Sequence, residues 1–245
     1  MSVYFAHGTG FCGGVWRPVI DVLENIPCVA WDFAGHGSGP PLEFPVDWRI
    51  FAEQVLAETE PGGIGVGHSM GSAALVMAQL LDPDRFRFLV LVEPIILPGP
   101  PQPLEHPVID VAVKRRRRFK SREAARAVFA EKEPFSGWHP SALDGYLECG
   151  LVGDGPVELA CPPELEAEIF RASTNHDTWD RLGEVEIPVL ILAGDEGDPL
   201  PPDLFRAQAA QFPRAGVEIV PGVGHFLPME KPELVAERVR RVALI

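Results

Sequence analysis

Short apolar runs alternate with longer amphipathic segments along most of the chain. The short runs are typical of buried strands in a parallel sheet, and the longer segments carry the periodicity of helices. The runs predict strands at Val3–Ala6, Cys28–Asp32, Gly63–Gly67, Phe88–Val92, Val189–Ala193 and Val217–Val220. The segments predict helices at Trp16–Leu23, Asp47–Glu58, Ser69–Leu81, Pro202–Gln211 and Lys231–Val242. This alternation predicts an α/β fold, in which helices cover both faces of a mostly parallel six-stranded sheet.

The alternation stops between residues 98 and 179. This stretch begins with the proline-rich sequence PGPPQPLEHP and shows only helical or irregular patterns. Within it, Ser121 is a predicted helix N-cap. We therefore divide the chain into an α/β core, residues 1–97 and 180–245, and a helical lid inserted at residues 98–179. Such an insertion would rise from the carboxyl edge of the sheet and lie over a site formed there.

The length, net charge and apolar content of the chain limit the kinds of molecule that the protein is expected to bind. The 245 residues suffice for one core with an inserted lid. A net charge of −14 argues against binding to nucleic acid and against docking on anionic lipid. The sequence has no run of about 18 uncharged apolar residues, so no stable membrane insertion is expected. The N-terminal sequence MSVYFAHGTG lacks the features of a signal peptide, which predicts a cytoplasmic protein.

The cysteines and a basic run have structural interpretations. Cysteines occur at positions 12, 28, 149 and 161 without C-x-x-C pairing or metal-ligand spacing, which predicts free thiols. The basic run at residues 114–118 predicts a solvated helix face whose charge is neutralised by nearby acidic residues. The alternative for this run is that one arginine lines the mouth of a pocket and attracts an acidic substrate.

A serine between two glycines follows the third predicted strand and precedes a predicted helix. The sequence there is Gly67-His68-Ser69-Met70-Gly71. A strand that turns sharply into a helix crowds its own backbone, so the flanking positions must be small and the tip residue is strained and points outward. Unpaired N–H groups at the start of the helix favour a developing negative charge. Ser69 is therefore a candidate nucleophile.

A serine nucleophile needs a base, and His225 is the best candidate. It follows the last predicted strand and a glycine-rich turn, which places it at the same carboxyl edge of the sheet as Ser69. Three other histidines compete for the role. His7 and His36 lie in glycine-rich turns, where shaping of the backbone is the simpler interpretation. The side chain of His68 is expected to point away from the reacting hydroxyl.

Three carboxylates are candidates to orient the imidazole of His225. Asp195 and Asp198 follow the fifth predicted strand, and Glu93 follows the fourth. All three satisfy the chain order of serine, acid and histidine.

An oxyanion in the reaction needs two backbone N–H donors. The N–H of Met70, at the start of the predicted helix, would supply one of them. Thr9 would supply the other, because it lies in the sequence HGTG after the first strand, where glycines allow close backbone approach.

Taken together, these motifs resemble those of the α/β-hydrolase superfamily, in particular its serine esterase, lipase and C–C hydrolase group. HGTG, DFAGHGSG, GHSMG, AGDEGDPLPP and GVGHFLPMEKPE occur in the order typical of that family. The resemblance implies a triad with Ser69 as nucleophile, and it favours Asp198 as the acid because Asp198 follows Gly194 by four positions. It also implies a minimal sheet, whose first strand corresponds to the third strand of the family, and Ser72 stands where glycine is frequent. The chain has no Rossmann fingerprint, P-loop or H-E-x-x-H motif, so neither a cofactor nor a metal is implied.

We therefore expect a serine hydrolase that cleaves a small or medium, apolar carboxylic ester or lactone through an acyl-enzyme on Ser69. A serine nucleophile disfavours haloalkane dehalogenase and epoxide hydrolase chemistry, which need a carboxylate at this position. Cleavage of a C–C bond in a diketone, thioester hydrolysis and perhydrolysis use the same triad and are alternatives. The alternative from another class is a non-catalytic ligand-binding module of the same fold.

The lid is expected to set specificity. Its aromatic residues either line an apolar pocket or pack the lid onto the core, and they are Phe119, Phe135, Trp138, Tyr146, Phe170 and Trp179. His176 is interpreted either as a polar pocket contact or as a surface or capping residue. The strand at Cys28–Asp32 is expected at an edge of the sheet, a position open to pairing with a second copy. The sequence does not decide the oligomeric state.

Overall fold

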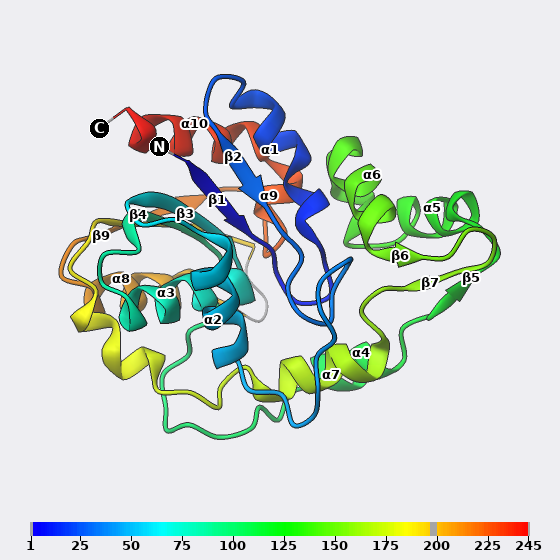
Figure 1. The fold of residues 1–245 in the computed structure, drawn as a ribbon, viewed down its shortest axis with the longest axis horizontal. Helices are drawn as coiled ribbons and strands as arrows, with labels where there is room; N and C mark the ends of the chain where they lie inside the picture. The colour runs from blue at the N-terminus through cyan, green and yellow to red at the C-terminus, as the bar shows by residue number, and fades with distance from the viewer. Residues whose placement is uncertain (1, 197–199, 245) are drawn as a thin grey trace.

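The computed structural model describes residues 2–196 and 200–244, and a parallel sheet forms its centre (Figure 1). The strand order is β2-β1-β3-β4-β8-β9, and every neighbouring pair is parallel. The strands are β1 (Val3–Ala6), β2 (Cys28–Ala30), β3 (Gly63–His68), β4 (Phe86–Val92), β8 (Val189–Gly194) and β9 (Ala215–Val220). The six predicted strands are confirmed with small shifts at their ends, and β2 lies at an edge as expected.

Successive side chains of the strands enter two separate apolar layers. In β1, Val3 and Phe5 belong to the layer on one face of the sheet, whereas Tyr4 and Ala6 belong to the layer on the other face. This alternation is the two-residue period of a strand that is buried on both sides. The apolar runs of the sequence therefore belong to a sheet with two covered faces.

Helices provide the cover on both faces (Figure 1). Those on the face of Phe5 are η1 (Gly13–Trp16), α1 (Arg17–Val22), α9 (Leu227–Glu230) and α10 (Pro232–Ala243). Those on the face of Tyr4 are α2 (Arg49–Glu58), α3 (Met70–Leu81), η3 (Thr178–Glu184) and α8 (Pro202–Gln211). The five helices predicted for the core are confirmed. Within residues 2–196 and 200–244, no helix is both long and apolar enough to span a membrane.

The segment between β4 and η3 differs from the purely helical insertion that the sequence predicts. Its helices are α4 (Pro107–Val113), α5 (Arg122–Ala130), η2 (Phe135–Gly137), α6 (Pro140–Cys149) and α7 (Pro163–Ala172). It also holds a small antiparallel sheet of β5 (Arg118–Phe119), β7 (Val157–Leu159) and β6 (Leu151–Val152). Strands this short carry no periodicity that a sequence pattern can reveal. The arrowheads of β1 and β2 point toward this segment, which lies beyond the carboxyl edge of the large sheet (Figure 1).

The basic run forms the connection from α4 to β5 and the first residue of β5, which corrects the expectation of a helix face. Helix α4 ends at Val113, and continuing it through the run would place like charges on neighbouring turns. Arg117 and Arg118 are exposed and pair with Glu158 of β7. Arg115 is turned inward instead, where most of its side chain is buried. Three of the five basic residues are therefore paired with acidic residues that are distant in sequence.

Two of the four cysteines form a disulfide, which corrects the expectation of free thiols. The Sγ atoms of Cys12 and Cys149 are 2.00 Å apart, and the bond joins the loop after β1 to the last turn of α6. The two residues are separated by 137 positions, so no local spacing signals their pairing. Cys28 and Cys161 are free, as expected.

Candidate active site

Ser69 occupies the turn between β3 and α3 in a conformation that few residues adopt. Its φ is 55° and its ψ is −117°, and its N–H donates to the carbonyl oxygen of Val92 over 2.9 Å. The flanking glycines are sterically required. A Cβ on Gly67 would lie 2.6 Å from the backbone nitrogen of Ser72, and a Cβ on Gly71 would overlap the carbonyl oxygen at the end of β1. The glycines of the G-x-S-x-G sequence therefore leave the space that this closely packed turn requires.

The imidazole of His225 lies beside the hydroxyl of Ser69. His225 is in the loop between β9 and α9, and its Nε2 is 3.1 Å from Ser69 Oγ. This distance is within hydrogen-bond reach, as proton transfer from serine to histidine requires. The side chain of His225 is 25% exposed, whereas Ser69 is 6% exposed. The pair therefore lies just below the surface at the carboxyl edge of the sheet.

The carboxylate that contacts His225 belongs to Glu93, which directly follows β4. Glu93 Oε2 is 3.3 Å from Nδ1 of His225, and Glu93 Oε1 accepts the N–H of Gly194 at 2.6 Å. The side chain of Glu93 is 2% exposed. A buried carboxylate fixed on one oxygen by a backbone donor presents its second oxygen to the imidazole. Contacts therefore run continuously from Ser69 through His225 to Glu93.

The other two candidate carboxylates have different positions. Asp195 Oδ1 accepts the N–H of Gly222 at 2.8 Å, in the turn after β9, and its side chain is exposed. Asp198 belongs to residues 197–199, which lie outside the described part of the chain. Within the described residues, Glu93 is therefore the candidate carboxylate that contacts the imidazole.

The two backbone N–H groups that the sequence predicts as oxyanion donors belong to segments next to Ser69. Neither Thr9 N–H, in the loop after β1, nor Met70 N–H, at the start of α3, has a hydrogen-bond acceptor among the described residues. A Cβ on Gly8 would lie 3.1 Å from Cβ of Ser69, so this loop closely approaches the serine. The N–H of Gly10 is already donated to a histidine ring. Thr9 therefore offers a free backbone donor in the HGTG sequence.

His7 and His36 shape these turns, in agreement with the simpler interpretation of the sequence. Nε2 of His7 accepts the N–H of Phe33 at 3.0 Å, and Nε2 of His36 accepts the N–H of Gly10 at 3.0 Å. Both rings are buried, and burial lowers the pKa of His7 to about 4 and the pKa of His36 to about 3. The rings are thus neutral at pH 7 and able to accept these hydrogen bonds.

The ring of His68 contacts the backbone of His225, the candidate base. Its Nε2 is 2.8 Å from the carbonyl oxygen of His225, and the two ring centroids are 5.0 Å apart. The ring of Phe11 stacks on His68 at 6.2 Å. Because burial lowers the pKa of His68 well below its usual value, the ring is neutral and donates from Nε2 to the carbonyl. This contact holds the backbone that carries the base, and nothing in the sequence signals it.

The aromatic residues of the insertion pack mainly into the core. The four that belong to the buried layer shared with β1 are Phe119, Phe135, Trp138 and Tyr146. Phe170 packs between α4 and α7, and Trp179 is half-buried against the opposite layer. The ring of His176 lies 5.6 Å from that of Trp48. Packing is therefore the role that the described contacts support for these aromatic residues.

A buried ion pair lies against the HGTG loop. Arg115 donates to Glu166 at 2.5 Å and to the hydroxyl of Tyr146 at 3.0 Å. A Cβ on Gly10 would lie 3.1 Å from Nη1 of Arg115. Burial raises the pKa of Glu166. One arginine of the basic run thus reaches the loop beside the nucleophile, but its charge is paired.

One group of potential metal-ligating side chains converges within the described residues. Ligand atoms of Cys12, Asp32 and Cys149 lie within 4.8 Å of one another. The two cysteines are joined in a disulfide, so they offer no thiolate to a metal ion. The donor set therefore does not fit a metal site.

The sequence predicts Ser69 as nucleophile, His225 as base and the two backbone donors, but its family resemblance favours Asp198 over Glu93 as the acid. The available signal for Glu93 is a charged residue directly after the apolar run FLVLV, on the strand beside that of the nucleophile. This signal marks Glu93 as one candidate acid. It does not select among the three carboxylates, because that choice depends on where the loops place the imidazole of His225.

Comparison with known proteins identifies relatives over nearly the whole chain. A sequence model described as the alpha/beta hydrolase family matches residues 3–238. Abhydrolase domain-containing protein AFT2-1 of Alternaria alternata is 26% identical in a 211-residue alignment that covers 71% of this chain and 80% of that protein. Esterase YbfF of Escherichia coli is 22% identical in a 227-residue alignment that covers 90% of this chain and 84% of that protein.

Solved structures share the fold. Peroxisomal alpha-beta-hydrolase Lpx1 from Saccharomyces cerevisiae superposes with a TM-score of 0.84 at 19% identity, covering 99% of this chain and 75% of that one. E-2-(acetamidomethylene)succinate hydrolase gives a TM-score of 0.81 at 22% identity, covering 98% of this chain and 90% of that one. At these identities the likeness establishes the fold and leaves the substrate to other arguments.

Proposed function

Because the chain belongs to the alpha/beta hydrolase family, we propose that it is a serine hydrolase of a small or medium, apolar carboxylic ester or lactone. The observation that carries this proposal is the continuous set of contacts at the carboxyl edge of the sheet. Ser69 Oγ is 3.1 Å from His225 Nε2, and His225 Nδ1 is 3.3 Å from Glu93 Oε2. A serine, a base and an orienting acid in this order are the parts that acyl transfer needs.

In the proposed reaction, each group acts on the next. Ser69 Oγ attacks the carbonyl carbon while His225 Nε2 takes its proton. The carboxylate of Glu93 holds the imidazole and stabilises its positive charge. The N–H groups of Thr9 and Met70 donate to the oxyanion of the tetrahedral intermediate. His225 then protonates the leaving alcohol, and it activates the water that hydrolyses the acyl-enzyme on Ser69.

Two further parts of the proposal concern the setting of the reaction. Residues 98–179 would act as a lid on the core, since this segment lies beyond the edge that carries Ser69. The acidic chain favours a small-molecule substrate over nucleic acid. A cytoplasmic location stays a prediction, and a Cys12–Cys149 disulfide that persists in cells would argue against it, because cytosolic thiols are kept reduced.

Stopped-flow kinetics with p-nitrophenyl esters of increasing acyl length test the proposal. The wild-type protein is expected to show a burst followed by steady turnover, because acylation of Ser69 releases the first p-nitrophenol. Ser69→Ala is expected to remove the burst and to lower kcat by about a thousandfold or more without unfolding the protein. Near-normal turnover by this variant would exclude Ser69 as the nucleophile. If the wild-type protein cleaves no ester, diketones and thioesters become the substrates to examine.

A further inference from the structure

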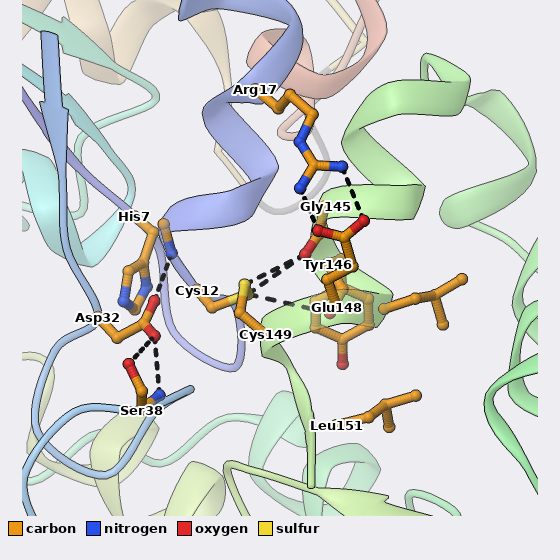
Figure 2. The surroundings of a disulfide bond; sticks show 12 residues. His7, Cys12, Arg17, Asp32, Ser38, Gly145, Tyr146, Glu148, Cys149 and Leu151 are labelled. Carbon is orange, nitrogen blue, oxygen red and sulfur yellow. Dashed lines mark hydrogen bonds and ion pairs between the residues drawn. A yellow bond between two sulfur atoms is a disulfide. The ribbon is translucent and has the colours of Figure 1, made fainter. Parts of the chain in front are cut away.

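The Cys12–Cys149 disulfide borders a surface cavity of about 410 Å³ beside η1 and α6. Cys149 lines this cavity, whereas Cys12 is fully buried. Figure 2 shows the bond with Asp32 on one side and the Arg17–Glu148 pair on the other. One sulfur of the disulfide is therefore open to attack from the cavity, and the other is shielded by protein.

Acidic groups outnumber basic ones along this cavity. Asp32, Glu58 and Glu148 line it, and Arg17 is the basic residue of the described lining. Arg17 is paired with Glu148, which leaves the charges of the other two carboxylates in excess. The carboxylate of Asp32 lies within 4.8 Å of both sulfurs and is fixed by the N–H of Gly13 at 2.7 Å. The cavity thus attracts a cation to the disulfide and repels an anion.

We propose that this cavity is a thiol-exchange site, at which a small thiol that carries an ammonium group and no carboxylate reacts with the disulfide at Cys149. The thiolate attacks Cys149 Sγ and forms a new S–S bond while the bond to Cys12 breaks. Cys12 leaves as a thiolate and takes up the proton that the attacking thiol released. The product is a mixed disulfide on Cys149, with its ammonium group near Asp32. A second thiol then frees Cys149 and leaves with the first as a small-molecule disulfide.

The packing around the disulfide determines where a group added to Cys149 can lie. A Cβ on Gly14 would lie 2.7 Å from Cys149 Sγ and would overlap the carbonyl oxygen of Gly145. A group on Cys149 therefore has room in the cavity and none toward η1. The close approach of Gly14 to Gly145 and the Arg17–Glu148 pair are contacts between η1–α1 and α6 that do not depend on the disulfide. This proposal is independent of the hydrolytic reaction.

Two matched variants test which sulfur reacts. Cys12→Ser leaves Cys149 as a thiol in the cavity, and Cys149→Ser leaves Cys12 as a thiol in the interior. After incubation with cystamine, peptide mass spectrometry is expected to find the cysteamine adduct on Cys149 of the first variant and no adduct on Cys12 of the second. Equal modification of both cysteines, or an unmodified Cys149, would overturn the proposal.

The wild-type protein gives a test that does not depend on variants. Alkylation under denaturing conditions, before any reduction, is expected to label Cys28 and Cys161 and to spare the other two cysteines. Cysteamine followed by an acid quench is then expected to trap the mixed disulfide on Cys149. Labelling of Cys12 and Cys149 before reduction would overturn the proposal, because the disulfide is its starting point. A trapped adduct on Cys12 would overturn it as well.

The charge preference is tested with Glu58→Gln and with Glu60→Gln as its control, each combined with Cys12→Ser. Glu58 lines the cavity, whereas Glu60 is an exposed carboxylate outside the described lining. The rate with cystamine divided by the rate with oxidised glutathione is expected to fall roughly twofold at low ionic strength in Glu58→Gln. The ratio should stay constant in Glu60→Gln. A ratio that Glu58→Gln leaves unchanged would exclude selection by the cavity charge.

Discussion

Ser69 and Glu93 share an unusual backbone conformation. They are the two non-glycine residues with positive φ in the described chain, at 55° and 51°, and they follow the neighbouring parallel strands β3 and β4. Such conformations persist where the surrounding structure imposes them, and they cluster at functional sites. Here both turns direct a side chain toward the ring of His225. The backbone therefore supports Glu93 as the acid independently of the distance to the imidazole.

Substitution of the two competing acids distinguishes them. Glu93→Gln keeps the size of the side chain but removes the negative charge that stabilises the imidazolium, so kcat for a p-nitrophenyl ester is expected to fall at least about 100-fold. Asp198→Asn is expected to leave kcat near the wild-type value. A large loss in Asp198→Asn with little effect of Glu93→Gln would assign the acid to Asp198.

The hydrogen bond from His68 to the backbone of His225 predicts a positioning role. His68→Leu removes the donor, and His68→Gln restores an amide donor near the position of Nε2. We expect His68→Leu to lower kcat about tenfold or more with little change in KM, since small displacements of a catalytic group are costly. His68→Gln should recover most of kcat. Equal losses of kcat in both variants, or losses that parallel a loss of thermal stability, would show that His68 acts only in packing.

At the scale of elements, the junction of β1, β3 and α3 depends on a glycine within a helix. Gly71 belongs to α3, and an added Cβ would lie 2.6 Å from the carbonyl oxygen of His7. Alanine normally stabilises a helix relative to glycine. We expect Gly71→Ala to do the opposite and to lower the free energy of unfolding by about 1–3 kcal/mol in urea titrations.

Gly183 of η3 provides the control for this prediction. A Cβ there meets its nearest heavy atom at 3.8 Å, an ordinary contact. Gly183→Ala should therefore be neutral or stabilising. If both substitutions change the free energy of unfolding alike, helix propensity and not the close approach of α3 to β1 determines the effect.

The elements differ in how far the sequence predicts them, and the reason is physical. Strands such as β3 are buried on both faces and carry continuous apolar runs, so their pattern identifies them. The strands β5 and β6 are two residues long and form only by pairing with β7, a non-local contact without a sequence signature. The Cys12–Cys149 bond is non-local as well. At the site, the turn chemistry of Ser69 is local and predictable.

On the scale of the whole molecule, buried neutral histidines link the fold to pH. His7 and His36 are fully buried, and burial lowers the pKa of His7 to about 4 and the pKa of His36 to about 3. In the unfolded chain both rings return to a pKa of about 6.5. Unfolding therefore takes up protons below pH 6.5, and the stabilisation from the neutral rings is present above that pH and lost as the pH falls toward 4.

We expect the free energy of unfolding to fall by about 2 kcal/mol for each of these rings between pH 7.5 and pH 5. The raised pKa of buried Glu166 acts in the opposite sense, since its contribution is lost as the pH rises. Urea titrations at several pH values measure the net change of the free energy of unfolding with pH.

His36→Gln keeps an acceptor for the N–H of Gly10 but removes one titrating ring. This variant should lose about 2 kcal/mol less than the wild-type protein over the same pH interval, and an unchanged slope would show that His36 is not a source of the pH dependence.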